Sequence, residues 1–370
     1  MRLINILVVG QTPPPVHGQA IMIEKLVRAS FSRLKIFHVR MAFSHDLVDV
    51  GKLRIGKLLH LARVLLEIVA IRARHRIDIL YYPPSGSSRT AMWRDCALLV
   101  PLRRLFPKTI FHFHAAGASD LFLTLSTFER RLFRAAYGTP DCTIRISSFC
   151  PNDGDLIGTR RDAIIPNGIE DIAYGVIRKR PSEACPRILF VAAMRESKGV
   201  RVLIEATRML ASKGLDFEVE FVGEWTSSAF RDQVMALVAE YGLSERVCFR
   251  GLLVGEEKHQ AFADADIFAF PTFFEIEMFP LVAIEAMCFG LPVVASAWRG
   301  LPSIVDDGVS GFLTPPHDAA AFAERLEQLI TDPDKALKMG RAGRARYLEH
   351  FTFEQHLAQM EQLLVEVHQG

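Results

Sequence analysis

The sequence predicts an α/β protein with two Rossmann-like, doubly wound domains that face each other across a cleft. Short apolar runs rich in β-branched residues alternate with helix-like stretches along the 370 residues. The runs are continuously apolar, as in parallel strands that helices cover on both faces. Repeated strand–helix–strand units of this kind indicate doubly wound sheets, and ligands bind such sheets beyond the carboxyl ends of their strands.

The expected strands fall into two groups, one in each half of the chain, with helix-like stretches between them. The first group is 4–10, 34–40, 77–83, 109–115 and 142–147, and the second is 187–193, 217–223, 247–251, 266–271, 292–296 and 311–315.

The break between the domains is predicted in the stretch "GVIRKRPSEACPR", residues 175–187. This stretch is charged, contains Pro181 and Pro186, and leads directly into a new strand. We therefore expect an N-terminal domain over 1–180 and a C-terminal domain over 181–350. The amphipathic residues 351–370 are expected to form a helix that packs back at the domain junction.

Charge is divided unevenly between the two halves. Residues 1–180 contain 27 Lys and Arg against 14 Asp and Glu, whereas residues 181–370 contain 17 against 28. This asymmetry predicts that the two domains meet different partners.

Cysteine usage and hydropathy exclude several classes of protein. The six cysteines are scattered without a CxxC spacing, which predicts a reduced, cytoplasmic protein rather than a disulfide scaffold. The twelve histidines do not fall at ligand spacings, so no metal site is expected. The apolar stretch 58–71 is too short and too charged to cross a bilayer.

The stretch "PTFFEIEMFPLVAIEAM", residues 271–287, carries the main candidate site. Proline is tolerated at the first position of a helix, so a helix should begin near Pro280. The backbone N–H groups of Phe279, Leu281 and Val282 would then form an anion-binding end. Glu277 and Glu285 flank that end, and carboxylates are good hydrogen-bond partners for the hydroxyls of a sugar or a ribose.

The spacing of Glu277 and Glu285 resembles the E-x7-E signature of family 4 of the retaining glycosyltransferases, which have the GT-B fold. Four further stretches resemble motifs of that family, in the family's order. They are "QTPPPVHGQAIMIEKLV" near the start, "IIPNGIE", "RESKGVRVLIEA" and "GLPSIVDDGVSGFLTPPHD".

The resemblance implies a role for each candidate residue. Glu277 and His114 would be the catalytic residues that contact the donor sugar, and Glu285 would bind the ribose. Lys198, Gly18 and the amide cluster around Pro280 would bind the diphosphate of a UDP- or GDP-sugar. Neither a metal nor any further cofactor is implied. His112 is a neighbouring alternative to His114, and strand-end histidines are often structural.

One residue departs from the family pattern. Many members carry an arginine five positions before the lysine, where this chain has Ala193. Arg195 or Arg299 would then have to replace it, or the affinity for phosphate is lower.

The predicted function is transfer of a sugar, with retention of configuration, to a hydroxyl acceptor of bacterial cell-surface glycan synthesis. The acceptor is expected to be a lipid-linked or glycan intermediate. Two alternatives stay open: a catalytically weak relative that binds a nucleotide sugar or a partner protein, and a sugar-nucleotide epimerase of the same fold.

Basic stretches in the N-terminal half predict contact with an anionic membrane surface. Residues 52–76, 102–108 and 129–134 combine cations with apolar side chains. Nucleic acid is ranked lower because no nucleic-acid-binding motif accompanies the charge. The expected location is the cytoplasm, at the inner face of the cytoplasmic membrane.

Overall fold

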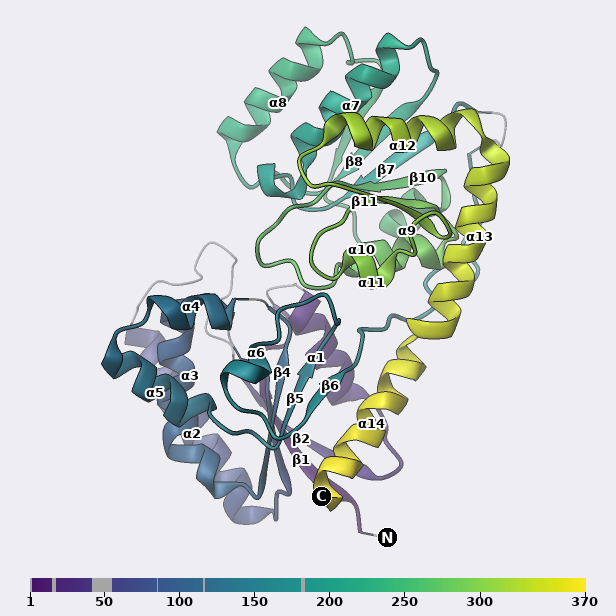
Figure 1. Cartoon of the computed structure of the whole chain (residues 1–370). Helices are drawn as coiled ribbons and strands as arrows, with labels where there is room; N and C mark the ends of the chain where they lie inside the picture. Colours follow the sequence, from purple (N-terminus) through teal and green to yellow (C-terminus); the bar gives the residue numbers. More distant parts are fainter. Residues whose placement is uncertain (1, 15–17, 42–54, 85, 116, 181–183) are drawn as a thin grey trace. The chain divides into compact units, whose positions relative to one another are not determined.

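The computed structural model describes residues 2–14, 18–41, 55–84, 86–115, 117–180 and 184–370. The chain divides into two compact units, one formed by Met1–Asn167 with Glu354–Gly370 and the other by Gly168–Phe353. Each unit contains a six-stranded parallel sheet with helices packed on it (Figure 1). The predicted α/β class with two doubly wound sheets is therefore confirmed.

The sheet of the N-terminal unit has the strand order β2-β1-β3-β4-β5-β6. All its pairings are parallel. The strands are β1 (Ile4–Gly10), β2 (Leu34–Arg40), β3 (Ile79–Tyr82), β4 (Lys108–Phe113), β5 (Cys142–Arg145) and β6 (Asp162–Ile164). The first five match the predicted strands, whereas β6 was missed because three residues give no readable pattern.

Helices cover both faces of this sheet, and β1 shows why its buried residues are apolar on both sides. Leu7 and Val9 point into a core shared with α2, α3 and α5, while Ile6 and Val8 point into a core shared with α1 and α14. The helices are α1 (Gly18–Arg28), α2 (Ile55–Arg74), α3 (Arg89–Leu102), η2 (Arg103–Leu105), α4 (Ala118–Thr124), α5 (Thr127–Tyr137), α6 (Asp153–Leu156) and α14 (Phe353–Gln369).

The sheet of the C-terminal unit has the strand order β12-β11-β10-β7-β8-β9, with all pairings parallel. Its strands are β7 (Arg187–Val191), β8 (Glu218–Val222), β9 (Val247–Gly251), β10 (Ile267–Phe270), β11 (Val293–Ser296) and β12 (Gly311–Thr314), each within or equal to a predicted run. Its helices are η3 (Glu196–Lys198), α7 (Val200–Ser212), α8 (Ser228–Glu240), α9 (Gly255–Ala263), α10 (Leu281–Cys288), α11 (Leu301–Ile304), α12 (Ala319–Thr331) and α13 (Pro333–His350).

The boundary between the units lies at Asn167/Gly168, earlier than the predicted 180/181. The reason is that the charged stretch before residue 181 is bound to the C-terminal unit. The Arg178 guanidinium pairs with Asp266 at 2.8 Å, and the Lys179 amide donates to Asp264 at 2.7 Å. The stretch has the composition of a linker, but it is held against the C-terminal unit by these contacts, and we call residues 171–179 the strap.

The predicted C-terminal helix is present as α14, and it belongs to the N-terminal unit. Its apolar side enters that unit's core through Met360, Leu363 and Leu364, among others. The chain thus crosses between the units twice, and the two crossings are tied together. The Ile169 amide donates to the Phe351 carbonyl, and the Phe353 amide donates to the Ile169 carbonyl, each at 2.9 Å.

Candidate functional site

Two loops meet at the carboxyl ends of β7 and β10, which are neighbouring parallel strands of the C-terminal unit. One loop covers residues 192–199 and the other covers 271–280. The Phe273 amide donates to the Ser197 carbonyl at 2.9 Å and joins them. The Trp298 indole N–H donates to the Phe274 carbonyl at 2.8 Å and fixes the second loop from its other side. Residues far apart in the sequence therefore lie on one surface.

Gly199 makes this close approach of the loops possible. Its φ is +82°, a value that L side chains rarely adopt, and a Cβ there would lie 2.0 Å from the Pro271 carbonyl oxygen. Only glycine fits between η3 and α7 at this point. The conformation of Gly199 thereby sets the position of the adjacent Lys198.

Lys198 and Glu277, both predicted as site residues, are in direct contact. The Lys198 ammonium pairs with the Glu277 carboxylate, and the two side chains are 14% and 13% exposed. The Lys198 Nζ lies 4.7 Å from the centre of the Phe274 ring, and the Arg195 guanidinium lies 4.6 Å from the same ring. Two cations thus lie over one aromatic ring, which is a favourable arrangement for both of them.

The helix predicted near Pro280 begins where expected, with Pro280 at the cap position and Leu281 as its first residue. The Ala283 amide donates to the Pro280 carbonyl at 3.1 Å. The amides of Leu281 and Val282 precede it in the first turn, where backbone N–H groups have no partner within the helix. This end of α10 is suited to an anion. Phe279 is buried, with its ring packed edge-to-face on Phe351 at 5.8 Å.

Glu285 lies further along α10 and is paired with a lysine that the sequence did not indicate. The Lys258 ammonium lies 2.9 Å from one Glu285 carboxylate oxygen and 2.7 Å from the other. The two side chains are 23% and 16% exposed. Lys258 lies on α9, and no local sequence pattern predicts that it lies beside Glu285.

His114 follows β4 in the N-terminal unit and stacks on His112, with the ring centres 3.9 Å apart. The two histidines have different surroundings. His112 is fully buried and hydrogen-bonded through Nδ1 to the Tyr81 hydroxyl at 2.5 Å. Burial, followed by the nearby charge of His114, holds the pKa of His112 well below its ordinary value. His112 is therefore a neutral structural group, whereas His114 is partly exposed.

Gly18, the remaining predicted residue, is the first residue of α1 and is exposed. A Cβ at Gly18 would meet nothing within 4 Å, so packing does not require glycine there. Open space above a helix start is compatible with a ligand. Gly18 and His114 belong to the N-terminal unit, and the other predicted site residues belong to the C-terminal unit.

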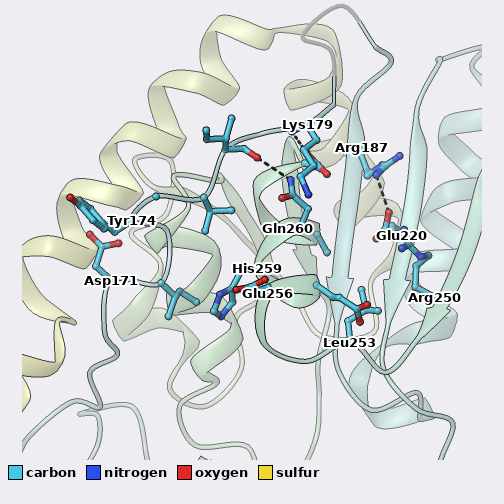
Figure 2. A pocket seen from close by; sticks show the side chains of 17 residues that line it. Asp171, Tyr174, Lys179, Arg187, Glu220, Arg250, Leu253, Glu256, His259 and Gln260 are labelled. Carbon is cyan, nitrogen blue, oxygen red and sulfur yellow. Dashed lines mark hydrogen bonds and ion pairs between the residues drawn. The ribbon is translucent and has the colours of Figure 1, made fainter.

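A cavity of about 920 Å³ in the C-terminal unit is lined by none of the predicted site residues. It lies between the strap 171–179, α9 and the strands β7, β8 and β9 (Figure 2). Three of its charged groups already pair with each other, Arg187 with Glu220 at 3.1 Å and Arg250 with Glu220 at 3.5 Å. Size alone does not make this cavity the functional site.

No group of three or more His, Cys, Asp or Glu side chains in the described ranges has a geometry that could hold a metal ion. No helix in the part of the chain that the structure describes is both long and apolar enough to span a bilayer.

The segment 178–346 matches the family model described as "Glycosyl transferases group 1". This segment belongs to the group 1 glycosyltransferases. It contains Lys198, Glu277, Glu285 and the start of α10, whereas Gly18 and His114 lie outside the matched range.

Curated relatives of the chain include glycosyltransferases named for the biosynthesis of colanic acid and of amylovoran. The chain is 34% identical over 274 residues to the putative colanic acid biosynthesis glycosyltransferase WcaL of Escherichia coli, covering 71% of this chain and 64% of that protein. It is 35% identical over 176 residues to the amylovoran biosynthesis glycosyltransferase AmsK of Erwinia amylovora, covering 46% and 42%. The matches thus span less than two thirds of the length of these relatives.

Solved structures resemble the chain over nearly its whole length. Alr3699/HepE from Anabaena, in complex with UDP, gives a TM-score of 0.75 at 18% identity, covering 98% of this chain and 100% of that one. Sucrose-phosphate synthase from Thermosynechococcus elongatus gives 0.73 at 20% identity, covering 98% and 99%. At these identities the likeness establishes the fold, which is GT-B.

Proposed function

We propose that the protein is a retaining glycosyltransferase that moves a sugar from a nucleotide diphosphate sugar, UDP- or GDP-linked, to a hydroxyl acceptor. The observation that carries this proposal is the contact between Lys198 and Glu277 at the start of α10. A cation, exposed helix amides and a carboxylate at one point suit a diphosphate attached to a sugar. The group 1 family match over these residues supports the same reading.

Each side chain of the site has a defined task in this proposal. The Lys198 ammonium and the amides of Leu281 and Val282 neutralise the diphosphate, which carries the developing negative charge as the glycosidic bond breaks. Glu277, released from Lys198, accepts hydrogen bonds from hydroxyls of the transferred sugar. Glu285 accepts from the ribose diol. Positioning and charge stabilisation supply the rate, and the leaving phosphate accepts the acceptor's proton.

Arg195 can supply the positive charge that is missing at Ala193. Its guanidinium and the Lys198 ammonium lie over the same Phe274 ring, so it stands where a second cation for the diphosphate is needed. Arg299 is directed differently, with its guanidinium 5.4 Å from the Trp298 ring. We assign the missing cation to Arg195, which argues for an active enzyme rather than a catalytically weak relative.

The N-terminal unit is proposed to bind the acceptor, and Gly18 and His114 are its candidate residues for the diphosphate and the donor sugar. WcaL and AmsK are named for colanic acid and amylovoran biosynthesis, which supports a glycan or lipid-linked intermediate of cell-surface polysaccharide as the acceptor. A lipid-linked acceptor would locate the protein at the inner face of the cytoplasmic membrane.

The donor is best identified by thermal-shift screening against nucleoside diphosphates and their sugars. HepE structures with UDP and with UDP-glucose make uridine compounds the first choice. A bound ligand raises the unfolding temperature by an amount that grows with the logarithm of its concentration relative to its Kd, so a selective shift names the donor. No shift with any member of the panel would contradict the proposal.

The carboxylate is tested by Glu277→Gln. We expect sugar transfer to fall roughly 100-fold or more, because the lost charge acts at the reacting sugar. Binding of the free nucleoside diphosphate should not weaken, since Lys198 loses a competing partner. Glu275→Gln, two positions away on an exposed side chain, is the matched control and should leave transfer unchanged.

Two further outcomes separate the alternatives. Formation of an epimer from the donor without any acceptor would identify an epimerase instead of a transferase. Activity in the presence of EDTA is expected, because the diphosphate charge is balanced by Lys198, Arg195 and the α10 amides, and loss of activity there would require a metal.

A further inference from the structure

The helices α2, α3 and α5 form one layer on the N-terminal sheet. Their buried residues, such as Val64, Cys96 and Phe133, enter the same core, and α3 lies against both α2 and α5. Figure 1 shows them together on one side of the sheet. Their outer sides therefore form one continuous surface, which we call the outer face.

The outer face is unusually apolar along α2. Leu59 is 69% exposed, Leu66 71% and Val69 45%. With Ala62 and Ala73, which are also exposed, they recur at intervals of three and four residues and form a straight stripe on the helix. This stripe is a second apolar side of α2, opposite the one that enters the core.

The apolar character continues over α3 and α5. Trp93 on α3 is 42% exposed and lies beside Phe128 on α5, which is 66% exposed, with the ring centres 6.3 Å apart. Val100 on α3 and Leu105 on η2 are 38% and 43% exposed. Isolated exposed apolar residues are ordinary, but a set that spans three adjacent helices marks an interaction surface.

The exposed charges of the outer face are almost all positive. Glu67 is the one exposed acid in the described parts of α2, α3, η2 and α5. The carboxylates of Asp95 and Glu129 are buried and bonded to Arg94 and Arg89. The exposed arginines of these elements are Arg63, Arg74, Arg89, Arg104, Arg131 and Arg134. Lys52 and Arg54, which belong to the predicted basic stretch, lie outside the described residues.

We propose that the outer face docks on an anionic lipid surface. The apolar stripe and the Trp93–Phe128 pair would enter the boundary between headgroups and acyl chains, and the arginines would meet the lipid phosphates. A second copy of this chain is a poorer occupant, because a two-fold contact would bring the same arginines together, and Glu67 is the one exposed acid among the described residues of these helices. The inference adds a membrane-binding surface to the proposed use of a lipid-linked acceptor, and it rests on that proposal.

Vesicle flotation of the full chain, without any donor, tests the inference. Binding is expected to vesicles that contain phosphatidylglycerol, to weaken as salt is raised, and to be lost on neutral phosphatidylcholine. Leu66→Glu should weaken binding by about tenfold or more, because burying a leucine exceeds the free energy of one tenfold step. Arg131→Glu with Arg134→Glu should weaken it on anionic vesicles as well.

Leu337→Glu is the matched control, because this leucine is 53% exposed on α13 of the other unit. It should bind vesicles like the unaltered chain. Equal binding to neutral and anionic vesicles, or no binding, would overturn the inference. So would a dimer seen by light scattering that Leu66→Glu dissociates. The thermal shift of Leu66→Glu with nucleoside diphosphates reads the donor site separately, so a failure of either proposal is recognised by itself.

Discussion

Ala193 and Arg195 stand two positions apart in one loop, and only the second carries a charge. The guanidinium of Arg195 and the ammonium of Lys198 lie over the Phe274 ring from neighbouring points of that loop. We predict that Arg195→Ala raises the Kd for UDP roughly tenfold or more, because a charge-assisted bond to phosphate is lost. Isothermal titration calorimetry measures the change directly.

Restoring the charge at the other position provides the control. Adding Ala193→Arg to Arg195→Ala should recover most of the lost affinity, since the side chain enters the same loop. UMP, which lacks the second phosphate, should be affected much less by either change. If Arg195→Ala leaves the Kd for UDP as it was, Arg195 does not serve as the second cation.

The sequence identified the types of residue at the site, but not all of their partners. Lys198 and Glu277 were each predicted as donor-binding residues, yet their contact with each other was not. They lie 79 positions apart, and only the pairing of β7 with β10 brings them together. Lys258 was missed for the same reason, because the packing of α9 beside α10 leaves no local signal.

At the scale of an element, the turn between η3 and α7 depends on Gly199. Alanine there would combine a left-handed backbone with a Cβ 2.0 Å from the Pro271 carbonyl oxygen. We predict that Gly199→Ala lowers the stability of the C-terminal unit by at least about 2 kcal/mol, because the loop 271–280 has to move. Thermal unfolding measures this as a drop of several degrees, accompanied by loss of UDP binding.

The substitution Gly214→Ala separates the effect of backbone strain from the effect of the close contact with Pro271. Gly214 has a similar φ of +74°, but a Cβ there would meet nothing within 4 Å. Its substitution by alanine should cost only about 1 kcal/mol of backbone strain and leave UDP binding intact. Equal effects of the two substitutions would show that the contact with Pro271 is unimportant.

Elements were predictable where burial imposes a pattern on the sequence. Strands covered on both faces are mostly apolar, so eleven runs could be recognised from composition and bounding residues. The start of α10 was predictable because Pro280 restricts the backbone. β6 was not, since its three residues are paired only on one side and only two of them are partly buried.

At the scale of the whole molecule, the domain boundary could not be read from local composition. The stretch 175–187 has the charges and prolines of a linker, but its cations bind acids that lie far along the chain. Arg180 pairs with Glu218 at 3.1 Å and with Asp266 at 3.3 Å. A linker and a docked strap therefore look alike in sequence. The helix α14 was likewise recognisable in the sequence as amphipathic, but the sequence did not show that it packs on the N-terminal unit.

The docking of α14 predicts a pH dependence of stability. His356, on α14, is 4% exposed, and its Nδ1 lies 2.8 Å from the Pro166 carbonyl oxygen. Burial, assisted by the charge of Lys25 and opposed by the bond to Pro166, lowers the pKa of His356 to about 4. The neutral ring donates its Nδ1–H to Pro166, and protonation in place would bury a charge.

The sign follows from the two pKa values. An unfolded histidine has a pKa of about 6.5, so between about pH 6.5 and pH 4 the unfolded chain binds the extra proton. The contribution of His356 to the free energy of unfolding is therefore complete above about pH 6.5. It falls by up to about 3 kcal/mol as the pH drops to 4. His112 acts in the same direction, because its pKa is also lowered.

His356→Gln tests this coupling, because glutamine keeps a donor for the Pro166 carbonyl but cannot titrate. We expect the free energy of unfolding in urea to change less between about pH 7 and pH 5 in this variant than in the unaltered chain. Any remaining dependence of the free energy of unfolding on pH in this variant should come from His112. His350→Gln, on a side chain that is 45% exposed on α13, should leave the dependence unaltered. If His356→Gln keeps the full slope, the pKa of His356 is not lowered in the folded unit, and the pH dependence of stability has another source.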